Sequence, residues 1–397
     1  MSRRGRLRKL LLPGAEWVSG NHVKLLQSGA EFFPALIAAI DAAQSEVHLE
    51  TYIFNPDHSA ALVRDALVRA AGRGIRVHVL VDGVGSRELP EDWLAMLKNA
   101  GVRILVYRPG ASVWRANPLS LRRLHRKLTV IDARIAFLGG INLIDDHEPV
   151  AHPDPRLDFS VEVRGPLLAD IHQSSRHLWR LVALSQLHSG LGNQPPLHPS
   201  WPTDGRVRAA FVMRDNFAHR RDIERSYLAA LALARSDILI ANAYFLPGRR
   251  FRGLVKKVAE RGVRVRLLVQ GHTDHPFFQL AARALYRDLL AAGVEIHEYQ
   301  ASELHAKVAV VDGRWATVGS SNIDPFSLML AREANIVVDD NDFAGDLQQR
   351  LQQAISRSTR LDPADWQRRP WPRRMLSWLA YGSVRVMVGL AGAGRWA

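Results

Sequence analysis

The chain has 397 residues, of which 47% are hydrophobic and 23% are charged, a composition typical of a globular protein with a sizeable core in two or three domains. It contains no cysteine, which excludes disulfides, thiolate metal sites and a cysteine nucleophile. Lysine and arginine (53) exceed aspartate and glutamate (39) by 14, so we expect an anionic partner, either a nucleic acid or an anionic membrane surface.

The first predicted segment is a basic leader over residues 1–20. Five of its first nine residues are Arg or Lys, and three leucines then precede Pro13. A signal peptide needs an apolar core of about 7–15 residues, which three leucines do not supply. We therefore expect a cytosolic leader that either contacts lipid headgroups or acts as a solubilising arm.

The body of the chain is a duplication. Each half contains, in the same order, an alanine-rich helix, a β-rich run stopped by proline, and two passages in which a helix ends at glycine and a strand follows. These passages are 33–43, 45–56, 73–81 and 100–104 in the first half, and 223–234, 236–247, 261–269 and 292–296 in the second. The order of strands and helices predicts two similar α/β domains that face each other, each with a largely buried sheet.

Composition sets the expected domain limits. A stretch rich in Pro, Gly, Ser and His at 186–205 is typical of a linker. We therefore place the first domain at 21–185 and the second at 206–350. The remaining residues, 351–397, are expected to form a separate tail.

Each half carries one His-x-Lys-x4-Asp motif followed by a glycine and an asparagine, at a constant offset of 180. The residues are His125, Lys127, Asp132, Gly139 and Asn142 in the first half, and His305, Lys307, Asp312, Gly319 and Asn322 in the second. A lone His-x-Lys is uninformative. Two complete copies inside a wider repeat are a strong signal.

The spacing of the motif indicates phosphate chemistry. His and Lys two positions apart on a strand project from the same face. Ammonium and carboxamide donors suit phosphate oxygens, and an imidazole with its ordinary pKa of about 6.5 can act as nucleophile or as acid/base. One histidine cannot easily be nucleophile and leaving-group acid in the same step. Two halves supply two histidines, which gives the duplication a function.

The doubled motif His-x-Lys-x4-Asp-x6-Gly resembles the signature of the phospholipase D superfamily, and the resemblance covers roughly residues 20–345. It implies two duplicated phospholipase-D-like α/β/α sandwich domains, related by a pseudo-twofold axis, with one shared active site between them. It also implies a phosphohistidine intermediate, with His125 as nucleophile and His305 as the acid/base. No metal and no other cofactor is implied.

The resemblance assigns roles to the other motif residues. Phosphate-binding residues would be Lys127, Lys307, Asn142 and Asn322. The motif aspartates, Asp132 and Asp312, complete the signature and are more often structural than catalytic in this superfamily.

The superfamily also has an acidic residue some 25–35 positions after each motif histidine, which supports the imidazole. Asp158 and Glu333 fit this spacing. Such a carboxylate would fix the tautomer and raise the basicity of the ring. The alternative is a surface charge at a strand edge.

Further matching stretches, at 125–127, 130–137, 240–245 and 315–325, resemble bacterial cardiolipin synthases, the B type in particular. The reaction implied is transfer of a phosphatidyl group from one phosphatidylglycerol to a second, giving cardiolipin and glycerol. Because one phosphodiester replaces another, no nucleotide is needed, and the sequence has neither a P-loop nor a dinucleotide fingerprint.

Two other activities fit the same motifs. A hydrolytic phospholipase D would share every catalytic residue, and a nuclease of this superfamily would also explain the basic charge. The tail favours the lipid interpretation, so we expect phosphatidylglycerol and a membrane surface as partners, and no nucleic acid. The expected location is the cytoplasmic face of the bacterial inner membrane, peripheral or monotopic.

The tail at 351–397 carries this expectation of membrane association. From Trp366 onward it has no acidic residue, six arginines and four of the ten tryptophans of the chain. Tryptophan and arginine beside short apolar runs favour a segment in the membrane interface, and Arg385 inside the apolar part argues against a full span. The alternative is a helix packed on the body of the protein.

Overall fold

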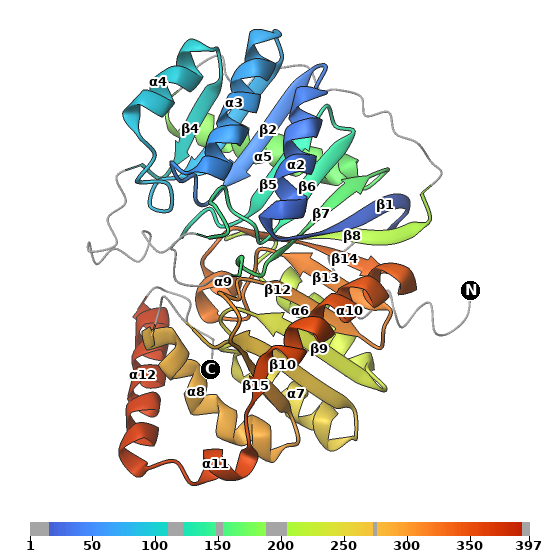
Figure 1. The fold of residues 1–397 in the computed structure, drawn as a ribbon, viewed down its shortest axis with the longest axis vertical. Helices are drawn as coiled ribbons and strands as arrows, with labels where there is room; N and C mark the ends of the chain where they lie inside the picture. Colours follow the sequence, from blue (N-terminus) through green and yellow to red (C-terminus); the bar gives the residue numbers. More distant parts are fainter. Residues whose placement is uncertain (1–15, 110–121, 148–153, 188–204, 273–275, 391–397) are drawn as a thin grey trace.

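The computed structural model describes residues 16–109, 122–147, 154–187, 205–272 and 276–390 (Figure 1). Most of the expected leader and of the expected linker therefore lies outside the described residues, as does Trp396 of the tail. The described part is an α/β protein, as the sequence predicts, and one continuous mixed sheet runs through both halves.

The strands of the two halves follow the same spatial order. Their bounds are β1 Val18–Gln27, β2 Glu46–Thr51, β3 Arg76–Asp82, β4 Arg103–Tyr107, β5 Lys127–Ile131, β6 Ile135–Gly139, β7 Phe159–Arg164, β8 Val207–Arg214, β9 Asp237–Asn242, β10 Arg264–Gln270, β11 Glu295–Tyr299, β12 Lys307–Val311, β13 Trp315–Gly319, β14 Glu333–Asp339 and β15 Ser358–Arg360. From the outside inwards the first half runs β4-β3-β2-β5-β6-β7-β1 and the second β11-β10-β9-β12-β13-β14-β8, with β15 beyond β11. The antiparallel pair β1–β8 joins the halves.

Helices cover both faces of the sheet. Their bounds are α2 Ser28–Asp41, α3 His58–Gly72, α4 Glu91–Asn99, α5 Leu168–Ser185, α6 Asp222–Leu233, α7 Arg249–Glu260, α8 Pro276–Ala291, α9 Pro325–Met329, α10 Asn341–Ser356, α11 Pro363–Gln367 and α12 Trp371–Leu390. In the first half α2, α3 and α4 pack on one face and α5 on the other; in the second half α6, α7 and α8 pack on one face and α10 on the other (Figure 1). This is the α/β/α sandwich that the superfamily resemblance implies.

Strand β2 shows how the sequence produces this layering. All six of its residues are buried, because helices cover both faces. Successive side chains alternate between faces, so Val47 and Leu49 join the cluster formed with α2 and α3. Glu50 points the other way and accepts a hydrogen bond from Ser175 of α5 at 2.9 Å. The same alternation, continued to the end of β2, sets which side chains reach the active site.

Two expected domain boundaries differ from the element limits. Strand β1 begins at Val18, three residues before the expected start of the first domain at 21. Residue 350 falls inside α10, and β15 then pairs antiparallel with β11, so we propose that the second domain extends to Arg360. The repeat could not show this extension, because among the described strands β15 has no counterpart in the first half. None of the described helices combines the length and the apolar content needed to cross a bilayer.

The motif aspartates lie at the ends of β5 and β12 that are remote from the motif histidines. Asp132 accepts hydrogen bonds from the backbone N–H groups that precede β2, those of Gln44, Ser45 and Glu46. Asp312 does the same before β9, for Arg235, Ser236 and Asp237. Five strand positions, about 3.3 Å each, separate Lys127 from Asp132. The aspartates therefore lie away from the motif histidines and tie two strand connections together, which is the structural role that the resemblance favours over a catalytic one.

Replacing Asp312 should lower stability rather than change the chemistry. Several backbone N–H groups bond to this carboxylate, and although burial opposes ionisation, they hold the pKa of Asp312 below its usual range. We expect Asp312→Ala to lower the free energy of unfolding by about 2–3 kcal/mol and Asp312→Asn by about 1 kcal/mol, measured by urea denaturation. Activity per folded molecule should be preserved. A variant with unchanged stability and lost activity would instead give Asp312 a catalytic role.

Candidate active site

The two motif histidines are held where the halves meet, each by the backbone of the opposite half. The N–H of His125 donates to the carbonyl of Arg332 at 3.0 Å, beside a parallel bridge between Leu124 and Arg332. The N–H of His305 donates to the carbonyl of Leu157 at 2.9 Å, beside a bridge between Leu157 and Leu304. Neither histidine is therefore positioned by its own half alone.

The supporting carboxylates are exchanged between the halves in the same way. The Nδ1 atom of His125 lies 3.0 and 3.2 Å from the two carboxylate oxygens of Glu333. The Nδ1 atom of His305 lies 2.6 Å from a carboxylate oxygen of Asp158. Sequence spacing correctly selected two acids that contact a histidine, but it paired each acid with the histidine of its own half. The crossed backbone bridges are the physical reason for the correction.

Burial sets the protonation of these pairs. It lowers the pKa of His125 and lowers that of His305 well below its ordinary value, while neighbouring lysines act in the same direction. Burial also raises the pKa of Asp158 to about 6, against the opposing effect of Lys307. At neutral pH the free protein therefore has neutral imidazoles whose Nδ1 atoms face carboxylates, which leaves the Nε2 atoms for chemistry.

The two motif lysines complete a cationic centre. The ammonium of Lys127 donates to the carbonyl of His125 at 2.8 Å, and the ammonium of Lys307 donates to the carbonyl of His305. Burial lowers the pKa of Lys127 to about 7 and that of Lys307 to about 8. Each ammonium also lowers the pKa of the other half's histidine, so the motifs act on one shared space.

The two asparagines follow β6 and β13, three residues after the strand-ending Gly139 and Gly319, and both are buried. The carboxamide oxygen of Asn142 accepts from the N–H of Ile53 at 3.2 Å, which orients the side chain. In the second half the N–H of Ile323 donates instead to Asn242, and the carboxamide oxygen of Asn322 is buried without a hydrogen-bond partner. A buried polar atom without a partner costs about 1–3 kcal/mol, a cost that a bound polar group can relieve.

The motif glycines leave room for the strand beside them. A Cβ atom on Gly139 would lie 2.4 Å from the carbonyl oxygen of Phe159, and one on Gly319 would lie 2.2 Å from the side chain of Asn335. Gly140 matters directly, because a Cβ there would meet the Asp158 carboxylate at 2.2 Å. These glycines allow the strand that follows Asp158, and the strand that starts at Glu333, to pack against the motif.

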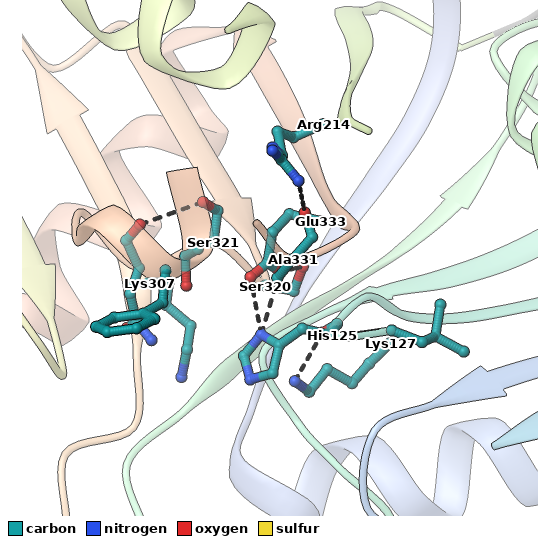
Figure 2. A network of polar contacts seen from close by, with 12 residues as sticks. His125, Lys127, Arg214, Lys307, Ser320, Ser321, Ala331 and Glu333 are labelled. Atoms are coloured by element: carbon teal, nitrogen blue, oxygen red, sulfur yellow. Dashed lines mark hydrogen bonds and ion pairs between the residues drawn. The ribbon is translucent and has the colours of Figure 1, made fainter. Parts of the chain in front are cut away.

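Four residues that sequence reasoning missed support the site. Ser320, the counterpart of Gly140, donates its hydroxyl to Glu333 at 2.5 Å (Figure 2). Arg214, whose pKa burial lowers to about 10, donates to the carbonyl of Ala331, two residues before Glu333. At the ends of β3 and β10, Asp82 and Gln270 accept from the N–H groups of Leu124 and Leu304 at 2.9 and 2.6 Å. Asp82 and Gln270 end equivalent strands of the repeat, and this match is the sequence signal that could have identified them as site residues.

One group of metal-ligand side chains occurs among the described residues, at the opposite end of β2. Glu46, His48 and His172 bring their ligand atoms close together there. Glu46 already contacts His172 at 2.6 Å and Arg76 at 3.1 Å. This cluster is an ion-paired network away from the motif histidines, and it assigns no metal to the active site.

The activity should have a bell-shaped pH dependence. Asp158 is ionised only above about pH 6, and Lys127 and Lys307 keep their charge only below about pH 7 and 8. We therefore expect kcat/KM, which reports the free protein, to fall below about pH 6 and above about pH 7, where Lys127 is the first lysine to lose its proton. Lys127→Arg should move the alkaline limb to about pH 8, where Lys307 loses its proton, since a guanidinium keeps its proton in this range. A flat profile from pH 5.5 to 9 would contradict these assignments.

Comparison with known proteins agrees with this geometry. A family model described as "Cardiolipin synthase, PLD-like domain" matches residues 36–147 and 227–355. The cardiolipin synthase B of Salmonella typhimurium is 40% identical over 387 residues, and that of Escherichia coli K12 is 38% identical; the matches cover 95% of this chain and 91% of those proteins. Phosphatidylserine synthase from Haemophilus influenzae superposes with a TM-score of 0.72 over 97% of this chain and 98% of that chain, at 14% identity, which is a likeness of fold.

The fold and the paired motifs define a phospholipase-D-like protein with both signature copies complete. Within that superfamily, the chain belongs to the cardiolipin synthase family, with the B-type synthases at 38–40% identity over nearly the whole chain.

Proposed function

We propose that this protein is a cardiolipin synthase that transfers a phosphatidyl group from one phosphatidylglycerol to a second, releasing glycerol. The observation that carries the proposal is the crossed arrangement, in which two histidine–carboxylate pairs and two lysines share one space. The relationship to the cardiolipin synthase family indicates that the substrate is phosphatidylglycerol. In this proposal the halves are related by a pseudo-twofold axis through the shared site.

The reaction proceeds in two displacements at phosphorus. In the first, the anionic phosphate of the bound donor raises the pKa of the neighbouring His305, which takes up a proton from solvent at Nε2. Nε2 of His125 then attacks the phosphorus of the donor, the bond from phosphorus to the glycerol oxygen breaks, and His305 gives that oxygen its proton. In the second, His305 takes the proton from a hydroxyl of the acceptor lipid. The acceptor oxygen then attacks phosphorus, the bond from phosphorus to His125 breaks, and cardiolipin forms.

The remaining residues act on charge and orientation. Glu333 and Asp158 hold the Nδ1 sides of the two rings, so that the Nε2 sides face the phosphate. Lys127 and Lys307, with Asn142 and Asn322, stabilise the negative charge that grows on the phosphoryl oxygens.

The assay is purified protein with phosphatidylglycerol alone in detergent micelles, without nucleotide. Cardiolipin and free glycerol, absent with His125→Ala and His305→Ala, support the proposal. Phosphatidic acid as the main product would instead indicate a hydrolase on the same fold, and the absence of any lipid product would refute a phosphatidylglycerol-dependent activity.

We further propose a peripheral or monotopic location on the cytoplasmic face of the cell membrane, with α12 as the lipid-contacting element. One side of α12 packs on α8, with Ala380, Tyr381 and Val384 in the core (Figure 1). The opposite side exposes apolar side chains and lies beside arginines. The exposed apolar residues are Trp371, Met375, Leu376, Trp378, Leu379, Val386 and Met387.

This face of α12 suits an anionic lipid surface. Tryptophan, leucine and arginine on one amphipathic helix favour the headgroup boundary, and the tail from Trp366 onward has no acidic side chain to oppose an anionic membrane. The proposal therefore combines the two alternatives for the tail: α12 packs on the body of the protein with one side and contacts lipid with the other.

Removing two apolar contacts from this face should weaken membrane binding. We expect Trp378→Ser with Leu379→Ser to reduce binding to phosphatidylglycerol vesicles at least about tenfold, because each buried apolar side chain contributes roughly 1.5–3 kcal/mol. Leu233→Ser, an equally exposed position on α6, is the matched control and should bind normally. Sedimentation with vesicles measures both. Equal binding by the double variant and the control would exclude α12 as the contact.

A further inference from the structure

A second ion pair, between Arg156 and Glu303, lies beside the pair formed by Asp158 and His305. The Nε atom of Arg156 donates to a carboxylate oxygen of Glu303 at 2.9 Å. Arg156 lies two positions before Asp158, and Glu303 lies two positions before His305. Side chains two positions apart on an extended chain project from the same face. Residues 156–158 and 303–305 therefore form a short ladder, in which the Arg156–Glu303 pair is the rung next to the imidazole.

Backbone contacts hold this ladder in register. The N–H of Leu157 donates to the carbonyl of Glu303 at 2.9 Å, and the N–H of His305 donates to the carbonyl of Leu157 at 2.9 Å. Rungs on one face are two residues apart, which is about 7 Å along an extended chain. The Arg156 side chain is therefore attached one rung away from the proposed acid/base.

Exposure places this ion pair between the site and solvent. Lys307 is fully buried, whereas the side chain of His305 is 18% exposed and that of Glu303 is 23% exposed. Exposure thus increases from Lys307 through His305 to Glu303, and Arg156 lies opposite Glu303 at the outer end of this series. A molecule that enters along this face passes the ion pair before it reaches His305.

The matching rung of the other half is different. The crossed backbone bridges define the equivalent positions, and there Ala331 takes the place of Arg156. Arg123 takes the place of Glu303, and its guanidinium donates to the buried Asp82 carboxylate at 3.0 Å. The ion pair across the ladder is therefore a feature of the acid/base side of the shared site.

The charge of Arg156 acts on the reacting groups. Burial lowers the pKa of His305, and the charges of Lys307 and Arg156 lower it further. A guanidinium has five N–H donors in a planar fork, so it can bond to a carboxylate and to a phosphate at the same time. Arg156 is thus placed for an anionic group on the alcohol that exchanges its proton with His305.

We propose that Arg156 binds the phosphodiester of the acceptor lipid and so selects an anionic phospholipid over a neutral alcohol as acceptor. The inference rests on the proposed function, with His305 as the acid/base. The acceptor oxygen must attack phosphorus in line, from the side opposite to His125, which is the side of this ladder. There it bonds to phosphorus, the bond from phosphorus to His125 breaks, and the hydroxyl proton passes to His305.

The length of the acceptor headgroup fits the spacing of the rungs. In phosphatidylglycerol three carbons separate the reacting hydroxyl from the phosphodiester. With the hydroxyl at Nε2 of His305, these carbons extend about as far as one rung, about 7 Å, and bring the phosphodiester to Arg156. The glycerol released in the first displacement has no phosphate, so Arg156 does not retain it. Arg156 is a specificity-determining residue in this account.

The test is a competition between two acceptors in neutral detergent micelles, with labelled phosphatidyl-p-nitrophenol as donor. Phosphatidylglycerol competes with an equal amount of a 1-O-alkylglycerol, which presents the same two hydroxyls without a phosphate. We expect the unmodified protein to form mainly cardiolipin, and Arg156→Ala to lower the ratio of cardiolipin to the alkylglycerol product at least about tenfold. Arg156→Lys keeps the charge but not the planar fork, so its ratio should lie between the two.

The readout is independent of stability, because a ratio of two products does not depend on how much protein is folded. Arg350→Ala is the matched control, since Arg350 forms the same kind of ion pair, with Glu31, outside the ladder. Its product ratio should equal that of the unmodified protein.

The outcomes separate the two claims. If the unmodified protein makes no cardiolipin, the proposed function fails. If it makes cardiolipin and both Arg156 variants keep its product ratio, Arg156 only supports the chain around His305 and the inference is overturned. An unmodified protein that uses both acceptors equally, or an equal fall of the ratio in Arg350→Ala, would also overturn it.

Discussion

His125→Ala and His305→Ala should each abolish cardiolipin formation from phosphatidylglycerol, with a fall in kcat on the order of 10⁴-fold. The first change removes the atom that attacks phosphorus. The second removes the acid without which glycerol, a poor leaving group, cannot depart. Since both residues serve one sequence of bond changes, the double variant should be no less active than either single variant. Thin-layer separation of labelled lipids measures all three.

The matched control for these variants is His22→Ala, a histidine on β1 outside the active site. It should retain most of the activity. If the His125 and His305 effects multiplied in the double variant, each histidine would serve a separate reaction, and the single shared site would be contradicted.

Glu333→Gln and Asp158→Asn should each lower activity by roughly 10²–10⁴-fold, through the histidine of the opposite half. Loss of the Glu333 charge removes an interaction that raises the pKa of His125, so the pKa of His125 should fall further. Loss of Asp158 removes the 2.6 Å contact that holds the His305 ring. Titration of the labelled imidazoles by NMR distinguishes the crossed pairing from pairing within each half.

The expected spectra are specific. Glu333→Gln should move the His125 signals and leave His305 nearly unchanged, and Asp158→Asn should do the reverse. Glu303→Gln provides a control, because Glu303 is a half-buried carboxylate paired with Arg156 and not with an imidazole. The crossed pairing would be wrong if Glu333→Gln disturbed the His305 ring and spared that of His125.

Much of this site could be predicted from the sequence, because the chemistry repeats at a fixed offset. The two His-x-Lys pairs and the two supporting acids lie at the shared space, and the duplicated strand–helix order matches β2 to β4 and β9 to β11. Signals that occur twice in one chain are informative without any alignment.

The pairing of acids and histidines could not be predicted in the same way. Asp158 and Glu333 lie at similar distances along the chain from His125 and His305, so spacing favours pairing within each half. What decides the matter is the contact between halves, where Leu124 bridges to Arg332 and Leu157 to Leu304. Sequence distance carries no information about contacts that form only when two domains meet.

Arg156 illustrates a second limit. An arginine in a basic protein is more often exposed to solvent than part of a site. Its place beside His305 depends on the contact between 156–158 and 303–305, which lie in different halves of the chain. Likewise, which side of α12 faces outward depends on its packing against α8, which the helical pattern alone does not specify.

The most direct test of the account is to trap the covalent intermediate in His305→Asn. With phosphatidyl-p-nitrophenol as donor, the leaving group needs no acid, so attack by His125 should proceed while transfer to an acceptor stays slow without the base. We predict that one equivalent of p-nitrophenol is released in a burst and that a phosphatidyl group is found on His125 by mass spectrometry. The bond between its phosphorus and the imidazole nitrogen should be stable to alkali and labile to acid. A phosphatidyl group on any other residue, or a burst without a covalent adduct, would contradict the account.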